Sequence, residues 1–177
     1  MAEEEVLEAR EKTNDREYFY KIIEKNPMLI EWANDEIRDD KEVLLKAVKI
    51  DGGALEFASE RLKADKDVLI ASVIQSGWTS CYASEELRAD KDVMLAACKK
   101  DGQSLYYASS ELRDDKEVVL AAVKNKPIIL KYASLRLRDD KDVVTAALEN
   151  EKKLVKDVVS YASDRLSNSD EIKKFLE

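Results

Sequence analysis

The stretch DDKEVVLAAVKNKPIILKYASLRLR, residues 114–138, decides the fold, because the chain repeats its pattern every 25 residues. Its tripeptide at residue 115, an aspartate followed by a basic and an acidic residue, has counterparts that begin at residues 15, 40, 65, 90 and 140. An aromatic-Ala pair recurs with the same step at residues 32, 57, 82, 107 and 132, and a sixth pair, Tyr161-Ala162, follows 29 residues later. Self-similarity at a fixed period is the signature of a repeat protein.

The first part of each repeat is predicted to be an α-helix that begins at the repeated aspartate. An aspartate in this place can accept hydrogen bonds from the unpaired N–H groups of the first turn. The predicted helix caps are Asp40, Asp65, Asp90, Asp115 and Asp140. The segment that follows, such as EVVLAAV at residues 117–123, is apolar on nearly every side. Such a helix must be covered all round, so we expect it to be the inner helix of its repeat.

The second part of each repeat is predicted to be a second helix that runs through the aromatic-Ala pair. It starts at a short break, such as Asp51-Gly52, and ends at an aliphatic residue, such as Leu62. If Leu55 points inward, a rotation of about 100° per residue places Ala58 and Leu62 beside it. Helix pairs of this kind cannot bury their faces alone, so they stack. The predicted fold is all-α: an α-solenoid of about six 25-residue helix-pair repeats with end-capping helices.

The predicted domain organisation is a single array between two caps. Residues 1–14 form the N-terminal cap, residues 15–169 the array with repeats that start near 15, 40, 65, 90, 115 and 140, and residues 170–177 a C-terminal capping helix. The stretch ENEKKLVKDVV, residues 149–159, lengthens the junction within the sixth repeat. We therefore expect the geometry of the array to change there.

The unit DDKEVVLAAVKNKPIILKYASLRLRDDKDVVTAAL, residues 114–148, resembles the family of helical repeats known as domain of unknown function 4116. The Asp, Tyr-Ala-Ser and Leu-Arg columns of that family coincide in register over about residues 15–166. The departures are Trp32-Ala33-Asn34 in the first unit, Ser80 where other units have Leu, Ile or Val, and the insertion in the sixth unit. The resemblance implies a helical repeat without enzymatic activity.

The charge of the chain argues against nucleic acid and membranes as partners. The 38 acidic and 30 basic residues give a net charge of −8, which repels phosphate backbones and anionic lipid surfaces. A repeated basic column that includes Arg113 and Arg138 could follow a phosphate backbone, but aspartates directly beside it favour a solvated ladder of ion pairs. The sequence shows neither an apolar run of about 20 residues nor a signal peptide. We therefore expect a cytoplasmic or otherwise intracellular protein, and delivery as an effector stays open.

The residue inventory argues against an enzyme. The chain has no histidine, which excludes Ser-His and Cys-His mechanisms and the usual zinc sites. Cys81 and Cys98 match neither a disulfide framework nor a metal motif. We therefore predict no catalytic residue, no metal and no cofactor. An enzyme that uses two carboxylates is the alternative, and it requires a deep pocket with an acidic pair that does not repeat.

Variation between repeats indicates where a partner could bind. On the outward side of the predicted second helices, the early repeats carry acidic residues and the later ones carry aromatic and apolar residues. Exposed apolar area of this kind tends to mark an interface, and Trp and Tyr are frequent hot-spot residues. The predicted partner-binding residues are Trp78, Cys81, Tyr106, Ile128, Lys131 and Leu135. A competing interpretation is that Trp78 folds inward over Ser80 and fills the space that a leucine occupies elsewhere.

These observations predict a protein–protein interaction module, or scaffold, that binds a protein partner of unknown identity. The alternative is a structural repeat protein that associates with a second copy of itself, as a homodimer, through the apolar half of the same face.

Overall fold

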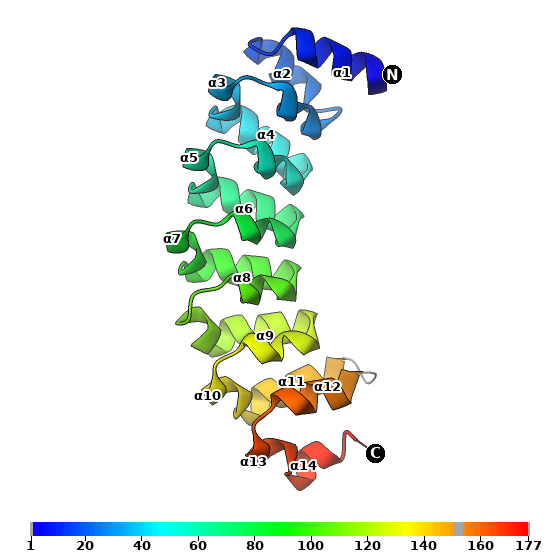
Figure 1. The fold of residues 1–177 in the computed structure, drawn as a ribbon, viewed down its shortest axis with the longest axis vertical. Coiled ribbons are helices and arrows are strands. Elements are labelled where there is room, and N and C mark those ends of the chain that lie inside the picture. Colours follow the sequence, from blue (N-terminus) through cyan, green and yellow to red (C-terminus); the bar gives the residue numbers. More distant parts are fainter. Residues whose placement is uncertain (1, 151–153, 177) are drawn as a thin grey trace. The chain divides into compact units, whose positions relative to one another are not determined.

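A computed structural model describes residues 2–150 and 154–176, and these residues form α-helices and 3₁₀ helices without any β-strand (Figure 1). The all-α class predicted from the sequence is confirmed. The chain divides into two compact units, residues 1–84 and residues 85–177. Each unit is described by itself.

The helices of the two units are given in chain order, with 3₁₀ helices labelled η. The first unit contains α1 (Ala2–Glu11), α2 (Arg16–Ile22), η1 (Pro27–Trp32), α3 (Asp35–Arg38), α4 (Lys41–Ile50), η2 (Gly52–Phe57), α5 (Glu60–Lys63), α6 (Lys66–Gln75) and η3 (Gly77–Tyr82). The second unit contains α7 (Glu85–Arg88), α8 (Lys91–Lys100), η4 (Gly102–Tyr106), η5 (Leu112–Asp114), α9 (Lys116–Asn125), η6 (Pro127–Tyr132), α10 (Leu135–Arg138), α11 (Lys141–Asn150), α12 (Val155–Tyr161), α13 (Asp164–Ser167) and α14 (Asp170–Lys173).

The prediction of one continuous second helix in each repeat is wrong. In the fifth repeat, η6 ends at Tyr132, Ala133 is extended with φ −66° and ψ 157°, and α10 then begins at Leu135. Ser134 fixes the break, because its hydroxyl oxygen accepts a hydrogen bond from the Leu137 N–H (3.2 Å) and so caps the short helix. Ser134 is thus a helix start, where the sequence interpretation placed a helix interior.

The long helices are covered on one side, so the prediction that they are covered all round is also wrong. In α9, Val118, Val119, Ala122 and Val123 are fully buried against the neighbouring helices α8 and α11 and the segments η4 and η6. The next face of the same helix, at Leu120 and Ala121, is only half-buried. The long helices carry more apolar side chains than one buried face requires, and the surplus lines an open face.

The sixth repeat departs from the others, as the sequence predicts. Its second segment is the α-helix α12, where the repeats before it have a 3₁₀ helix. Residues 151–153 of the inserted stretch lie outside the described residues, as do residues 1 and 177 of the two predicted caps. The caps include α1 at one end and α14 at the other, and the assignment of a single domain stays a prediction.

The repeated aspartates cap the long helices and also link neighbouring repeats. One carboxylate oxygen of Asp115 accepts hydrogen bonds from the N–H groups of Glu117 (2.9 Å) and Val118 (3.2 Å). The other oxygen accepts from the Lys91 ammonium of the preceding repeat at 2.8 Å. The equivalent pairs in the same arrangement are Arg16–Asp40, Lys41–Asp65 and Lys116–Asp140. One side chain therefore caps the start of a helix and fixes the register between two repeats.

A second link, here named the Asp-Ser-Arg clasp, joins some neighbouring repeats but not others. Asp114 accepts a hydrogen bond from the Ser134 hydroxyl and from Arg136 Nε (3.0 Å), and the same guanidinium donates to the Asp114 carbonyl oxygen at 2.6 Å. The same clasp is formed by Asp39, Ser59 and Arg61 and by Asp139, Ser163 and Arg165. The serine that caps the short helix is thus also held by the preceding repeat.

The two ends of the clasp change together along the chain. Where the aspartate is replaced by Ala64 or Ala89, the residue in the arginine position is Glu86 or Glu111. In the fourth repeat the segment that carries Glu111 lacks the short α-helix and has only the 3₁₀ turn η5. The third repeat, which carries Glu86, keeps its short helix α7, so the loss of the clasp does not by itself remove that helix.

Installing the missing clasp in the second unit should stabilise the protein. We expect the double variant Ala89→Asp/Glu111→Arg to gain up to about 1 kcal/mol in the free energy of unfolding, the upper range for an exposed ion pair. The single variant Ala89→Asp should not gain, because its new carboxylate would face Glu111. Urea denaturation of the double variant and both single variants measures the coupling, and equal midpoints for all of them would contradict this role of the clasp.

The clasps also predict a loss of stability in acid. The Ser134 hydroxyl and the Arg136 guanidinium lower the pKa of Asp114, and the same groups of other repeats lower the pKa of Asp39 and Asp139. In the unfolded chain an aspartate has a pKa of about 3.9, so the folded protein binds fewer protons. The clasps therefore stabilise the fold above that pH, and this contribution is lost as the pH falls through the lowered values.

Urea midpoints between neutral pH and about pH 3, below the ordinary pKa of an aspartate, measure this acid dependence. We expect the midpoint to fall over the last part of that range, and to fall less in Asp114→Asn, which has one such carboxylate fewer. An identical acid dependence in the two proteins would show that the Asp114 clasp contributes nothing.

Candidate interaction surface

In the first unit the structure places Trp78 on the surface, near the start of η3. Its side chain is 47% exposed, whereas Ser80 is fully buried, so the interpretation of Trp78 as core filling is wrong. The indole contacts the Tyr82 ring edge-to-face with 5.9 Å between ring centroids. It also lies over Gly53 of the preceding repeat, where an added Cβ would be 3.5 Å from the indole carbon Cζ2. Gly53 thus leaves room for the ring.

The two cysteines differ in their surroundings. Cys81, in η3, is half-buried beside the exposed Trp78 segment. Cys98 is fully buried in α8, and burial raises the pKa of its thiol to about 12. A thiol with that pKa carries almost no thiolate near neutral pH, so Cys98 acts as a small apolar core residue.

In the second unit the structure brings Tyr106 and Lys131 together around Tyr132. The Tyr106 ring meets the Tyr132 ring at a centroid distance of 5.0 Å and the Tyr107 ring at 5.1 Å, both edge-to-face. The Lys131 ammonium lies 4.9 Å from the centroid of the Tyr132 ring. We name Tyr106, Tyr107, Lys131 and Tyr132 the tyrosine cluster. Its rings hold one another in place while Tyr106 remains 53% exposed.

The other two predicted residues of the second unit flank Tyr132 in sequence. Ile128 is half-buried in η6, and Leu135 begins α10 with an exposed fraction of 79%, the highest among the large apolar residues that the structure describes. Leu135 owes this exposure to the break at Ser134, which starts a new helix there. Trp78 and Cys81 belong to the other unit, so the prediction that all six residues form one surface stays a prediction.

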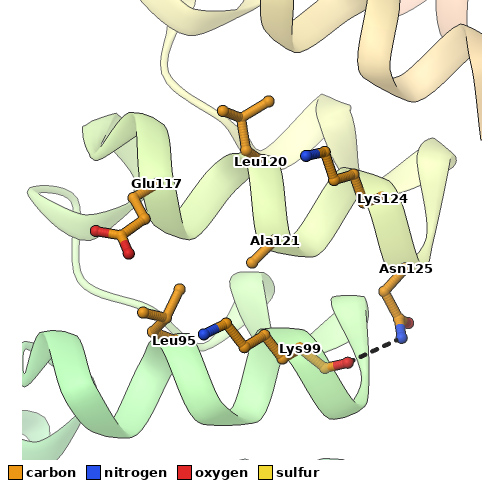
Figure 2. Close-up of a pocket in the computed structure, with 7 residues that line it drawn as sticks. All are labelled: Leu95, Lys99, Glu117, Leu120, Ala121, Lys124 and Asn125. Carbon is orange, nitrogen blue, oxygen red and sulfur yellow. Dashed lines mark hydrogen bonds between the residues drawn. The ribbon is translucent and has the colours of Figure 1, made fainter.

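A second surface, between the long helices, was missed by the sequence interpretation. Figure 2 shows a groove between α8 and α9, with a volume of about 470 Å³, whose apolar side chains are Leu95, Leu120 and Ala121. Lys99 and Lys124 line one end, and Glu117 lines the other. The signal for it was present in the sequence, because helices that are apolar on all sides but buried on one must expose the remainder.

The walls of this groove are held together at one end by Asn125. Its amide nitrogen donates to the Lys99 carbonyl oxygen at 3.2 Å, and its amide oxygen accepts from the Gly102 N–H at 2.8 Å. At the other end the Lys91 ammonium bridges to Glu117 at 2.9 Å. The groove is thus formed by two successive repeats whose side chains hold both of its ends together. The first unit has an equivalent between α4 and α6, lined by Ile70, Ala71 and Ile74, among others.

The residues that the structure describes contain no helix long and apolar enough to cross a membrane. Within the same residues, no three Cys, Asp or Glu side chains gather as metal ligands would. The absence of enzymatic activity and of cofactors stays a prediction.

Buried framework positions that recur along the chain, together with helices of successive repeats that pack on one another within each unit, define this chain as an all-α tandem-repeat protein. The family model described as Domain of unknown function (DUF4116) matches residues 15–63, 40–88, 65–113, 90–138 and 115–166. These windows cover most of the chain, and the chain belongs to this family. No curated protein and no solved structure matches it.

Proposed function

We propose that this protein is a non-enzymatic protein-binding module that uses its non-repeating exposed residues to bind a protein partner. One observation supports the proposal above the others: repeated framework positions are buried, whereas positions that change from repeat to repeat carry the exposed Trp78, Tyr106 and Leu135. Large apolar side chains that are exposed, and that the framework does not need, are typical of interaction surfaces.

The tyrosine cluster has the physical properties of a binding hot spot. Tyr106 is 53% exposed, and its contacts with the Tyr107 and Tyr132 rings restrain its rotation. A restrained ring loses little side-chain entropy on binding and buries a large apolar area. Lys131 adds a cation beside Tyr132, which supplies a polar edge for an acidic or carbonyl group of the partner.

The test compares a double variant of the proposed binding surface with a single variant elsewhere on the protein. In both, an exposed leucine is replaced by glutamate. Leu135→Glu/Tyr106→Ser should remove a specific protein that wild type captures from a lysate of the source organism. Leu7→Glu alters another exposed leucine, on α1, and should leave that protein bound. Circular dichroism and thermal melting of each variant establish that the fold is kept. Capture of the same proteins by both variants would show that the tyrosine cluster and Leu135 are not the binding surface.

A further inference from the structure

The outward face of α1 carries a stripe of side chains with a charge at each end, and the Arg10 guanidinium at its basic end lies 3.9 Å from the centroid of the Trp32 ring. Glu3, Val6, Leu7 and Arg10 line a depression of about 420 Å³, and Leu7 is 61% exposed. Their spacing, i, i+3, i+4 and i+7, places them along one side of the helix. Ala9, on another side, is fully buried. From the first residue to the last, the stripe reads acidic, apolar, apolar and basic.

The open face of α9 carries a stripe with the same spacing and the same order. Glu117, Leu120, Ala121 and Lys124 line the α8–α9 groove, and Leu95 and Lys99 of α8 form its other wall (Figure 2). Both stripes span seven steps of an α-helix, or about 10 Å. Because both stripes run from an acidic to a basic residue, their charges are complementary only when the two helices are antiparallel.

We propose that α1 of one copy of this chain docks in the α8–α9 groove of a second copy, antiparallel to α9. In this arrangement Glu3 faces Lys99 and Lys124, and Arg10 faces Glu117. Val6 and Leu7 enter the apolar middle of the groove. A parallel arrangement would place Glu3 against Glu117 and Arg10 against Lys124, so like charges select against it.

The shapes of the two surfaces favour this pairing over contact between two α1 helices. The groove has two helical walls, and a single helix projecting Leu7 fits between them, as side chains of one helix fit the grooves formed by others. Two α1 helices would give each Leu7 only one wall. The contact joins different surfaces of the two copies, so each complex keeps one unused α1 and one unused groove. Association should therefore continue into longer chains as the concentration rises.

Sedimentation velocity of the whole chain, from micromolar to millimolar concentration, tests the proposal with two variants. Leu7→Glu removes the apolar helix stripe, and Leu120→Glu removes the floor of the groove. We expect wild type to grow in mass with concentration and each variant alone to remain monomeric. An equimolar mixture of the two should form a one-to-one complex, because the intact helix of Leu120→Glu fits the intact groove of Leu7→Glu.

Several outcomes would overturn the proposal. One is a wild type that does not associate at any concentration, and another is association that survives in one of the variants; survival in Leu120→Glu would indicate contact between two α1 helices instead. A mixture that stays monomeric would exclude the pairing of helix and groove. Circular dichroism checks that Leu120→Glu folds, and the exposed pair Lys99→Glu/Lys124→Glu is a second test that leaves the apolar floor intact. Leu135 takes no part, so failure here leaves the proposed function untouched.

Discussion

Replacing Leu130 with alanine should lower the free energy of unfolding by about 2–5 kcal/mol, the range for a leucine deleted from a packed core. Leu130 is fully buried in η6, which packs against α9, α11 and η4. The substitution removes apolar contact with several elements at once and leaves a cavity that neighbouring repeats can close only by moving. Urea denaturation followed by circular dichroism gives the change.

Leu135 provides the matched control for that substitution. It lies five residues further along the same repeat, yet 79% of its side chain is exposed. Leu135→Ala should therefore change the free energy of unfolding by less than about 0.5 kcal/mol, as is usual for surface positions. Similar effects at the two leucines would mean that the buried and exposed columns have been assigned incorrectly.

Replacing Gly52 with alanine should cost about 1–3 kcal/mol, the usual range for overpacking. A Cβ added there would lie 2.4 Å from the Ser72 carbonyl oxygen and 2.9 Å from the Ser76 Cβ, so η2 would have to move away from α6. That movement would also stretch the hydrogen bond from the Ser72 hydroxyl to the Gly52 carbonyl, which is 2.8 Å long. In other repeats the equivalent position is occupied by Pro27 and Pro127, so the fold accepts a residue larger than glycine there. The expected effect of Gly52→Ala is therefore a local increase in the distance between η2 and α6.

The adjacent Gly53 is the control. A Cβ there meets no backbone atom closely; its nearest neighbours are the Asp51 side chain at 3.1 Å and the Trp78 ring at 3.5 Å. Gly53→Ala should therefore stay within about 0.5 kcal/mol of wild type. Thermal melting of the two variants side by side gives the comparison, and a larger loss for Gly53→Ala would contradict the close approach of η2 to α6.

Much of the fold follows from the sequence because the repeat period and the capping aspartates are strong local signals. Asp115 directly precedes the first turn of α9, where a short side chain that accepts hydrogen bonds is favoured. The hydrogen bonds that it accepts from the N–H groups of Glu117 and Val118 are those of a helix cap. The break at Ala133-Ser134 was missed because an apolar pattern with helical spacing continues across it. A 3₁₀ helix followed by a capped turn buries the same residues as one α-helix would.

The surfaces were harder to predict than the framework. The exposure of Leu135 and Tyr106 could be anticipated from their variable columns, although the helical geometry used to place them was wrong. The surplus apolar residues of the long helices indicate an open face, but they do not place the groove at Leu95 and Leu120, because an apolar residue on a helix does not reveal whether a neighbour covers it. The Asp-Ser-Arg clasp also depends on residues about 22 positions apart, beyond the reach of local patterns.

Hydrogen exchange of the chain with and without a captured partner tests the central claim, that the exposed variable residues form the binding surface, most directly. We expect slower exchange on binding in the segments that carry Tyr106 and Leu135, residues 103–107 and 128–137, with little change in α1. Protection confined to the long helices α8 and α9, or spread evenly over the chain, would contradict the claim.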